Sequence, residues 1–180
     1  MSLKYIANDI IDINGICDPT TIDIDTYPYW TQTSVTETLV IPEQKPDIEQ
    51  INSINASVEV IRTKVIVTPT SVGANEEGKI ITGRKLIVEG NVVQSVSYTA
   101  LEPAQSMHSA HFAVPFSAYI VIPETILIDG VDVDTLYINF QVNSCIEDIF
   151  VESFCTRYIF KNVTLFLQAV PAAIVACSDN

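Results

Sequence analysis

The stretch KLIVEGNVVQSVSYTA, residues 85–100, shows most clearly how this chain folds. Its large apolar residues fall mainly at every second position, and polar residues fill most of the positions between them. Because the side chains of a β-strand alternate between the two faces of a sheet, this pattern predicts a long strand with one buried face. Gly90 lies on the apolar face, where a missing side chain permits bending or close packing. The apolar face comprises Leu86, Val88, Val92, Val96 and Tyr98.

The segments on either side show the same period. Residues 56–68 alternate and then change phase, which is typical of a β-bulge. Residues 109–122 carry apolar residues at even positions, and Pro115 on the opposite face indicates an edge or bulged strand. Two further alternating segments, 134–146 and 149–169, complete the set. Long strands separated by polar turns predict an all-β fold, namely an antiparallel β-sandwich or a barrel-like structure of the jelly-roll type.

A rigid, acidic joint precedes these strands in the stretch IPEQKPDIEQI, residues 41–51. Pro42 ends a strand, because proline cannot donate a hydrogen bond to a ladder. Pro46 suits the first turn of a helix, and Asp47 is favourable near a helix N-terminus. We therefore expect one short helix near residues 46–54. The three residues would form a structural corner that caps the β core.

Composition and charge limit the classes of partner. Of the 180 residues, 48% are apolar and only 17% are charged, so part of the surface is uncharged, as in proteins that contact other proteins. The net charge of −13 argues against binding to nucleic acid or to an anionic membrane surface. The sequence after Met1 does not resemble a signal peptide, and no apolar run is long enough for a membrane helix. We therefore expect a soluble protein made in a cytoplasm.

Residues that carry chemistry are few. His108 and His111 are spaced by three, and we interpret them as loop or strand residues in preference to metal ligands. Two pairs of aspartates would each share a strand face, but a calcium site usually draws more ligands from one loop, so solvated carboxylates are the simpler interpretation. We expect no enzymatic activity, no cofactor and no metal. The aspartate pairs are Asp23 with Asp25 and Asp132 with Asp134.

The two ends of the chain appear as extensions of a central domain at residues 35–170. Residues 1–34 are rich in isoleucine, and they either pair within their own subunit or act as a donor strand or assembly arm for a neighbour. Residues 171–180 form a C-terminal tail. The stretch TYPYW at residues 26–30 is interpreted as a packed hook; alternatively, its aromatic side chains would bind a carbohydrate. The candidates for the assembly arm are Ile10, Ile13, Ile22 and Ile24.

The four cysteines are scattered and form no CxxC motif, so a zinc site is not expected. Cys145 and Cys155 fall within predicted strands, and we expect them to be buried or paired. Cys17 and Cys177 lie in the two extensions, outside the strand-rich centre.

Several of these segments together resemble the SPOCS domain of spore-forming Firmicutes. The corner at residues 41–51 is followed by the predicted strands in the order that this family shows. The similarity covers roughly residues 35–170. The resemblance implies a non-enzymatic domain of spore envelope proteins and supplies no catalytic residues. The matching positions are Val88, Gly90, Val96, Tyr98 and Ala100, then Val114, Pro115, Phe116 and Ser117, and finally Ile122 and Pro123.

From this resemblance we expect a structural protein of the spore coat, the exosporium or a spore appendage that self-assembles through β-strand and sheet-edge contacts. Its partners would be copies of itself, with other spore envelope proteins as further candidates. The protein would be made in the mother cell and would end in the spore surface layers. Disulfides between subunits, through Cys17 and Cys177, would form once the surroundings become oxidising. The alternative is an adaptor that recruits another coat protein through an exposed sheet edge.

Overall fold

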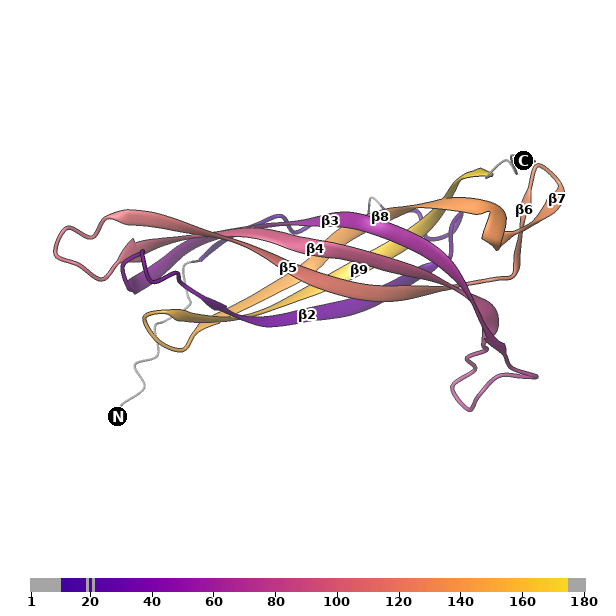
Figure 1. The fold of residues 1–180 in the computed structure, drawn as a ribbon, viewed down its shortest axis with the longest axis horizontal. Helices are drawn as coiled ribbons and strands as arrows, with labels where there is room; N and C mark the ends of the chain where they lie inside the picture. Colours follow the sequence, from indigo (N-terminus) through magenta and orange to yellow (C-terminus); the bar gives the residue numbers. More distant parts are fainter. Residues whose placement is uncertain (1–10, 19, 21, 175–180) are drawn as a thin grey trace.

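The computed structural model describes residues 11–18, 20 and 22–174, and these residues form strands almost throughout (Figure 1). The predicted all-β class is confirmed, since strands account for 70% of the structure. The strands are β1 (Asp12–Asn14), β2 (Trp30–Val40), β3 (Ile48–Thr70), β4 (Thr82–Ala100), β5 (Met107–Ile122), β6 (Thr125–Ile128), β7 (Val131–Asp134), β8 (Ile138–Ser153) and β9 (Tyr158–Ile174), and a 3-10 turn, η2, spans Thr135–Tyr137.

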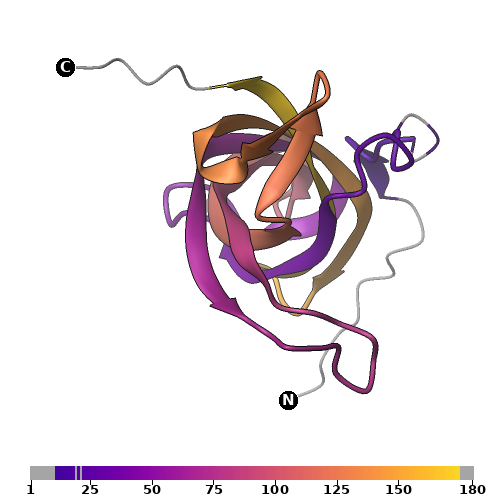
Figure 2. The ribbon, with the colours of Figure 1, turned by 90° about the vertical axis from the view of Figure 1, so that its right-hand side faces the viewer.

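Two sheets face each other across the core. The first sheet has the order β1-β3-β4-β5, the second has the order β2-β9-β8, and β6 and β7 form a separate hairpin. The view along the long axis in Figure 2 shows a rounded, barrel-like outline. The ladders remain separate, however, and β2 packs beside β5 while β3 packs beside β8. The meander order β3–β4–β5 differs from the interleaved order of a jelly roll.

The alternation of β4 places its apolar face in the core, as the sequence predicted. The five large residues of that face are at most 1% exposed. Gly90 lies among them, where an added Cβ would come within 2.4 Å of the carbonyl oxygen of Glu59 and 2.9 Å of the Phe116 ring. The phase change expected in residues 56–68 is a register shift between Val60 and Arg62. Glycine is therefore required at position 90, because the neighbouring strands leave no room for a side chain.

The prediction of a short helix near residues 46–54 is wrong, because β3 begins at Ile48 and pairs with β4 from its first residue. Ile48, Ile51 and Ile54 are all buried, at the three-residue spacing that resembles helical periodicity. The register of β3 against β4 shifts twice within this stretch. Each shift adds a residue, so positions three apart in the sequence reach the same face of a strand.

Candidate functional site

A corner at the left-hand end of Figure 1 carries the chain from β2 in the second sheet to β3 in the first. The strand ends just before Pro42, as expected. The guanidinium of Arg157, in the turn between β8 and β9, lies against this corner and forms an ion pair with Asp47. Arg157 therefore joins the crossover from β2 to β3 to the β8–β9 hairpin. Its Nη2 donates to the carbonyl oxygens of Ile41 at 3.2 Å, Pro42 at 2.7 Å and Lys45 at 3.2 Å.

Further contacts hold the same corner. The hydroxyl of Thr156 donates to Asp47 Oδ2 at 2.9 Å. The hydrogen bonds from Arg157 and Thr156 lower the pKa of Asp47. Burial raises the pKa of the Tyr98 phenol, which donates to the carbonyl oxygen of Pro46 at 3.1 Å. Pro42, Pro46 and Asp47 thus meet in one place, and their partners give the corner a structural role.

The N-terminal segment bridges the two sheets. β1 runs parallel to β3 in the first sheet, and Ile16 forms a bridge with Ile146 of β8 in the second. The amide of Cys17 donates to the carbonyl oxygen of Ile146 at 3.0 Å. Cys17 also forms a disulfide with Cys145 of the same chain. This pairing corrects the expectation that Cys17 joins a sister copy, because the path along β8 brings Cys17 to Cys145.

The other predicted arm and cysteine residues take different places. Ile13 lies in β1 and packs against the core of its own chain. Ile22 is half-buried and Ile24 is exposed. Cys145 is buried, whereas Cys155 is exposed and free, which makes the expected burial or pairing of Cys155 wrong. Cys155 lies in the turn between β8 and β9. Ile10 and Cys177 lie outside the described residues.

The chain then crosses the outer face of the second sheet. Gln168 of β9 donates from Nε2 to the carbonyl oxygens of Asp23 at 2.5 Å and Tyr27 at 2.9 Å. The rings of Trp30 and Phe166 stack with centroids 5.6 Å apart. The stretch TYPYW is therefore packed against the sheet, as its interpretation as a hook requires. We call this region, which contains Cys145, Phe166 and Gln168 under the described part of residues 16–30, the covered half.

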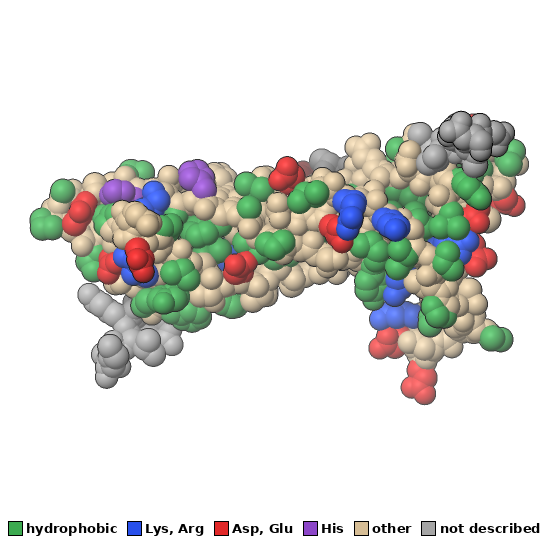
Figure 3. Space-filling model, viewed as in Figure 1, with side chains coloured by type: hydrophobic (Ala, Val, Ile, Leu, Met, Phe, Trp, Pro, Cys, Tyr) green, Lys and Arg blue, Asp and Glu red, His purple; other side chains and the backbone are tan. Residues whose placement is uncertain are grey.

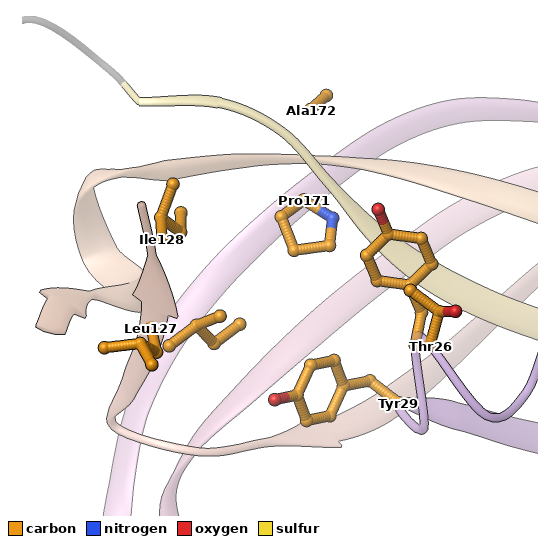
Figure 4. Close-up of a pocket in the computed structure, with 8 residues that line it drawn as sticks. Thr26, Tyr29, Leu127, Ile128, Pro171 and Ala172 are labelled. Atoms are coloured by element: carbon orange, nitrogen blue, oxygen red, sulfur yellow. The ribbon is translucent and has the colours of Figure 1, made fainter. Parts of the chain in front are cut away.

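A hollow of about 390 Å³ lies between the hook and the β6–β7 hairpin. Figure 4 shows Tyr29 and Pro171 facing the branched side chains of Leu127 and Ile128 across this space. Burial raises the pKa of the Tyr29 phenol. The described residues of the lining carry hydroxyl groups but no carboxylate, amine or imidazole, so they suit an apolar or aromatic group and offer no acid–base pair. The described lining residues are Thr26, Tyr27, Tyr29, Ile126, Leu127, Ile128, Pro171 and Ala172.

The other half of the same outer face is aromatic, and no other described segment covers it; we call it the bare half. The Phe160 ring lies 6.2 Å from the Phe150 ring and 5.7 Å from the Phe154 ring, measured between centroids. Tyr158 pairs in register with Val40 of β2. We call these five residues the aromatic patch. Its most open members are Phe150 at 49% exposed, Phe154 at 46%, Tyr158 at 47% and Val40 at 48%.

The surface seen in Figure 3 has the same uncharged character. Along the middle of the body, charged side chains are few, and hydrophobic and neutral polar side chains predominate. The exposed ring of Tyr119 in β5 is covered by the ammonium group of Lys85, which lies 4.0 Å from the ring centroid. The aromatic patch differs, because its rings contact only one another among the ring and cation contacts of the described residues.

A polar group that the sequence analysis missed lies inside the core. Lys161 of β9 is fully buried, and its ammonium donates to Oε1 of Gln94, which is 2% exposed. Burial lowers the pKa of Lys161 to about 8, while attraction to Glu37 acts in the opposite direction. The Nε2 of Gln94 is buried without a hydrogen-bond partner. The signal in the sequence was a lysine on the same strand face as Val163, Leu165 and Leu167.

The histidines and aspartates have local partners or face solvent. His108 Nε2 lies 2.9 Å from the Ser106 hydroxyl, and its ring stacks on Tyr98. His111 is exposed. Asp134 caps η2 and pairs with Arg84 at 3.2 Å. Among the described residues, no three His, Cys, Asp or Glu side chains gather as a metal site would require. Across this same part of the chain, every helix is too short or too polar to traverse a bilayer.

The comparisons with known proteins identify one family. The family model described as SipL, SPOCS domain matches residues 47–153. This match begins at Asp47 in the corner and ends at Ser153, the last residue of β8, so it covers β3 to β8. No curated protein and no solved structure matches the chain.

Proposed function

The chain belongs to the SipL SPOCS domain family, and from this premise we propose that it is a non-enzymatic structural subunit of the bacterial endospore envelope that assembles with copies of itself. The family supports a role related to sporulation. The aromatic patch carries the finer proposal of self-assembly. Exposed, contiguous apolar surface of this kind marks contact sites in soluble proteins.

The energetics favour a contact at the patch. Aromatic side chains dominate interface energies because each removes a large apolar area from water on binding. Four of the five patch residues are between 46% and 49% exposed, so much of their surface remains available to a partner. Lys and Arg are depleted on this chain, with 9 against 22 acidic residues, so association through basic patches is disfavoured. Apolar contact can join two acidic copies without basic side chains.

The N-terminal residues of a second copy are the proposed occupant. Ten residues precede Ile11, where the described chain begins, and they include several large apolar side chains. Such a segment can lie over rings as residues 16–30 lie over the covered half. The apolar members of this arm are Leu3, Tyr5, Ile6 and Ile10.

Disulfides between copies would reinforce this contact. Cys155 is exposed and free, and it directly follows Phe154 of the aromatic patch. With Cys17 bonded to Cys145, the remaining candidates are Cys155 and Cys177. They would react after lysis of the mother cell, when the spore surface layers become oxidising. Gel electrophoresis of spore extracts with and without reductant tests this step, with ladders expected only in wild type and not in a C155S/C177S variant.

Sedimentation and electron microscopy of the full-length protein test self-assembly. We expect oligomers or filaments that grow with concentration, and we expect the double substitution F150S/F154S to leave monomers. The matched control is M107S/Y119S, which removes two exposed apolar side chains from the first sheet. Monomers of wild type at high concentration, or equal assembly by both variants, would contradict the proposal.

The adaptor role is separated from self-assembly by what the patch captures. A pull-down from sporulating cells is expected to recover this same chain, with recovery reduced by F150S/F154S. One foreign coat protein in equal amount, recovered without self-capture, would establish the adaptor role instead.

A further inference from the structure

The core contains an amine and an amide that face each other across the two sheets. We propose that Lys161 and Gln94 become joined by an intramolecular isopeptide bond. The bond would link the side-chain nitrogen of Lys161 to the side-chain carbonyl carbon of Gln94. This inference concerns the interior of one subunit and does not depend on the aromatic patch.

The geometry brings the two groups together in the middle of both sheets. Lys161 lies on β9, the central strand of the second sheet, and Gln94 lies on β4, an interior strand of the first. The Lys161 Nζ contacts Oε1 of the Gln94 amide directly. Apolar residues flank both positions, since Val151 lies opposite Lys161 and Phe112 lies opposite Gln94 in register. The pair is therefore held in one arrangement and kept from bulk water.

The unsatisfied nitrogen of Gln94 is the second observation. A buried amide nitrogen without a partner costs free energy, and native cores seldom retain one without a reason. Nε2 of Gln94 is such an atom. It is also the atom that would leave in an exchange of one amide for another. The reaction would remove from the core the group that the fold leaves without a partner.

The chemistry balances without an oxidant or a further reactant. The lone pair of the neutral Lys161 amine attacks Cδ of Gln94, and a new carbon–nitrogen bond forms. The bond from Cδ to Nε2 breaks, and Nε2 leaves with a proton from the amine as ammonia. One amide and one amine thus become one substituted amide and one ammonia molecule. No electrons are transferred to or from an outside group.

A carboxylic acid residue lies beside Lys161 on the neighbouring strand. Glu37 of β2 is directly opposite Lys161 in the register of β2 and β9, and cross-strand neighbours of this kind lie on the same face of a sheet. Its carboxylate can accept the proton from Nζ and return it to the departing nitrogen. The lowered pKa of Lys161, about 8, leaves roughly a tenth of the amine neutral near pH 7. The fixed proximity of the Lys161 amine to the Gln94 amide accelerates the reaction further.

Mass spectrometry of the reduced full-length protein tests the bond. We expect a mass lower than the sequence value by one ammonia molecule. A protease that cleaves after glutamate should then release residues 90–102 joined to residues 153–180 as one branched peptide. Separate, unmodified peptides after prolonged incubation near pH 8 would overturn the proposal. The peptide assignment also excludes ammonia loss at Asn14–Gly15, which would leave these two peptides unlinked.

Two variants complete the experiment. K161M removes the amine and is expected to abolish the branched peptide. E37Q keeps the size of the side chain but cannot accept the proton, so it is expected to slow the bond by about 100-fold or more. Folding of each variant is checked by circular dichroism. Formation of the linked peptide by E37Q at the wild-type rate would overturn the assigned role of Glu37.

Discussion

The two halves of the outer face of the second sheet are built from the same strands, but another described segment covers only one of them. Over the covered half, the described part of residues 16–30 packs on β8 and β9. It is held by the Cys17–Cys145 disulfide, by hydrogen bonds from Gln168 and by the stacking of Trp30 on Phe166. Over the bare half, the rings of the aromatic patch remain open. The described chain supplies no cover for them.

An apolar outer face can therefore occur in a stable fold in two ways. Either another segment of the same chain covers it, or it stays exposed while contacts elsewhere hold the strands. On the covered half the chain buries Phe166, which is 7% exposed, under its own N-terminal segment. On the bare half the strands are held from their ends, by the contacts of Arg157 with the corner, and the rings contribute little to holding the strands together. The comparison therefore predicts large stability effects from the covered half and the corner, and small ones from the aromatic patch.

The largest expected loss follows removal of the Cys17–Cys145 disulfide. The C17S/C145S variant releases the segment over the covered half and opens a covalent loop that spans 128 residues. We expect the free energy of unfolding to fall by about 3 kcal/mol, because the unfolded chain gains conformational freedom. Urea titration under non-reducing conditions measures this change. C155S serves as the control and should unfold at the same urea concentration as wild type. An equal loss of stability in C155S would contradict the assignment of this effect to the disulfide.

The corner supplies the next largest effect. R157A removes the ion pair with Asp47 and leaves several carbonyl oxygens of the crossover without a donor. We expect a loss of about 2 kcal/mol. The control is R62A, which removes an exposed ion pair with Glu89 and should cost less than about 1 kcal/mol. Equal losses from the two arginines in urea titration would show that the corner does not hold the bare half.

Acid should weaken the corner. The pKa of Asp47 is lowered in the folded protein, so the unfolded chain binds the proton more readily. The stability contributed by Asp47 is therefore present above its ordinary pKa near 4 and is lost as pH falls through the lowered value. Urea titrations between neutral pH and pH 3 should show this loss in wild type. R157A should show a weaker dependence over the same range, and an identical dependence would contradict the role of the ion pair.

The smallest stability effect is expected from the aromatic patch. F150S/F154S exchanges two half-exposed rings for small polar side chains, so the monomer should lose about 1 kcal/mol or less, even though assembly is expected to be abolished. Thermal unfolding at low concentration, where copies are separate, measures this change. A loss as large as that of C17S/C145S would mean that the rings form part of the subunit core.

Alternation predicted the long strands β3, β4 and β5, but not every boundary or any partner. The strand predicted at residues 149–169 is wrong in extent, because the turn between β8 and β9 divides it at residues 154–157, and the β6–β7 hairpin was not predicted. The pattern of residues 85–100 gave the buried face of β4 correctly, because one buried face imposes a strict two-residue period. The same reasoning mistook the start of β3 for a helix, since register shifts spaced its isoleucines three apart. Periodicity alone does not distinguish a helix from a bulged strand over so short a stretch.

The residues that matter most in the candidate sites depend on contacts between distant segments. Arg157 was not singled out, because its partners lie more than 100 residues away in the sequence. The pairing of Cys17 with Cys145 depends on the path of the N-terminal segment along β8, which composition does not specify. Lys161 appeared as one charge in an apolar strand, and only the fold places Gln94 against it.

The most direct measurement replaces Phe150 with a photoreactive amino acid in sporulating cells. Irradiation followed by mass spectrometry identifies the molecule that lies against the bare half, and the same amino acid at Tyr119 provides the control. We predict cross-links from position 150 to residues 1–10 of another copy of this chain, and few from position 119. Cross-links only to a different protein, or none at position 150 in mature spores, would contradict self-assembly through this face.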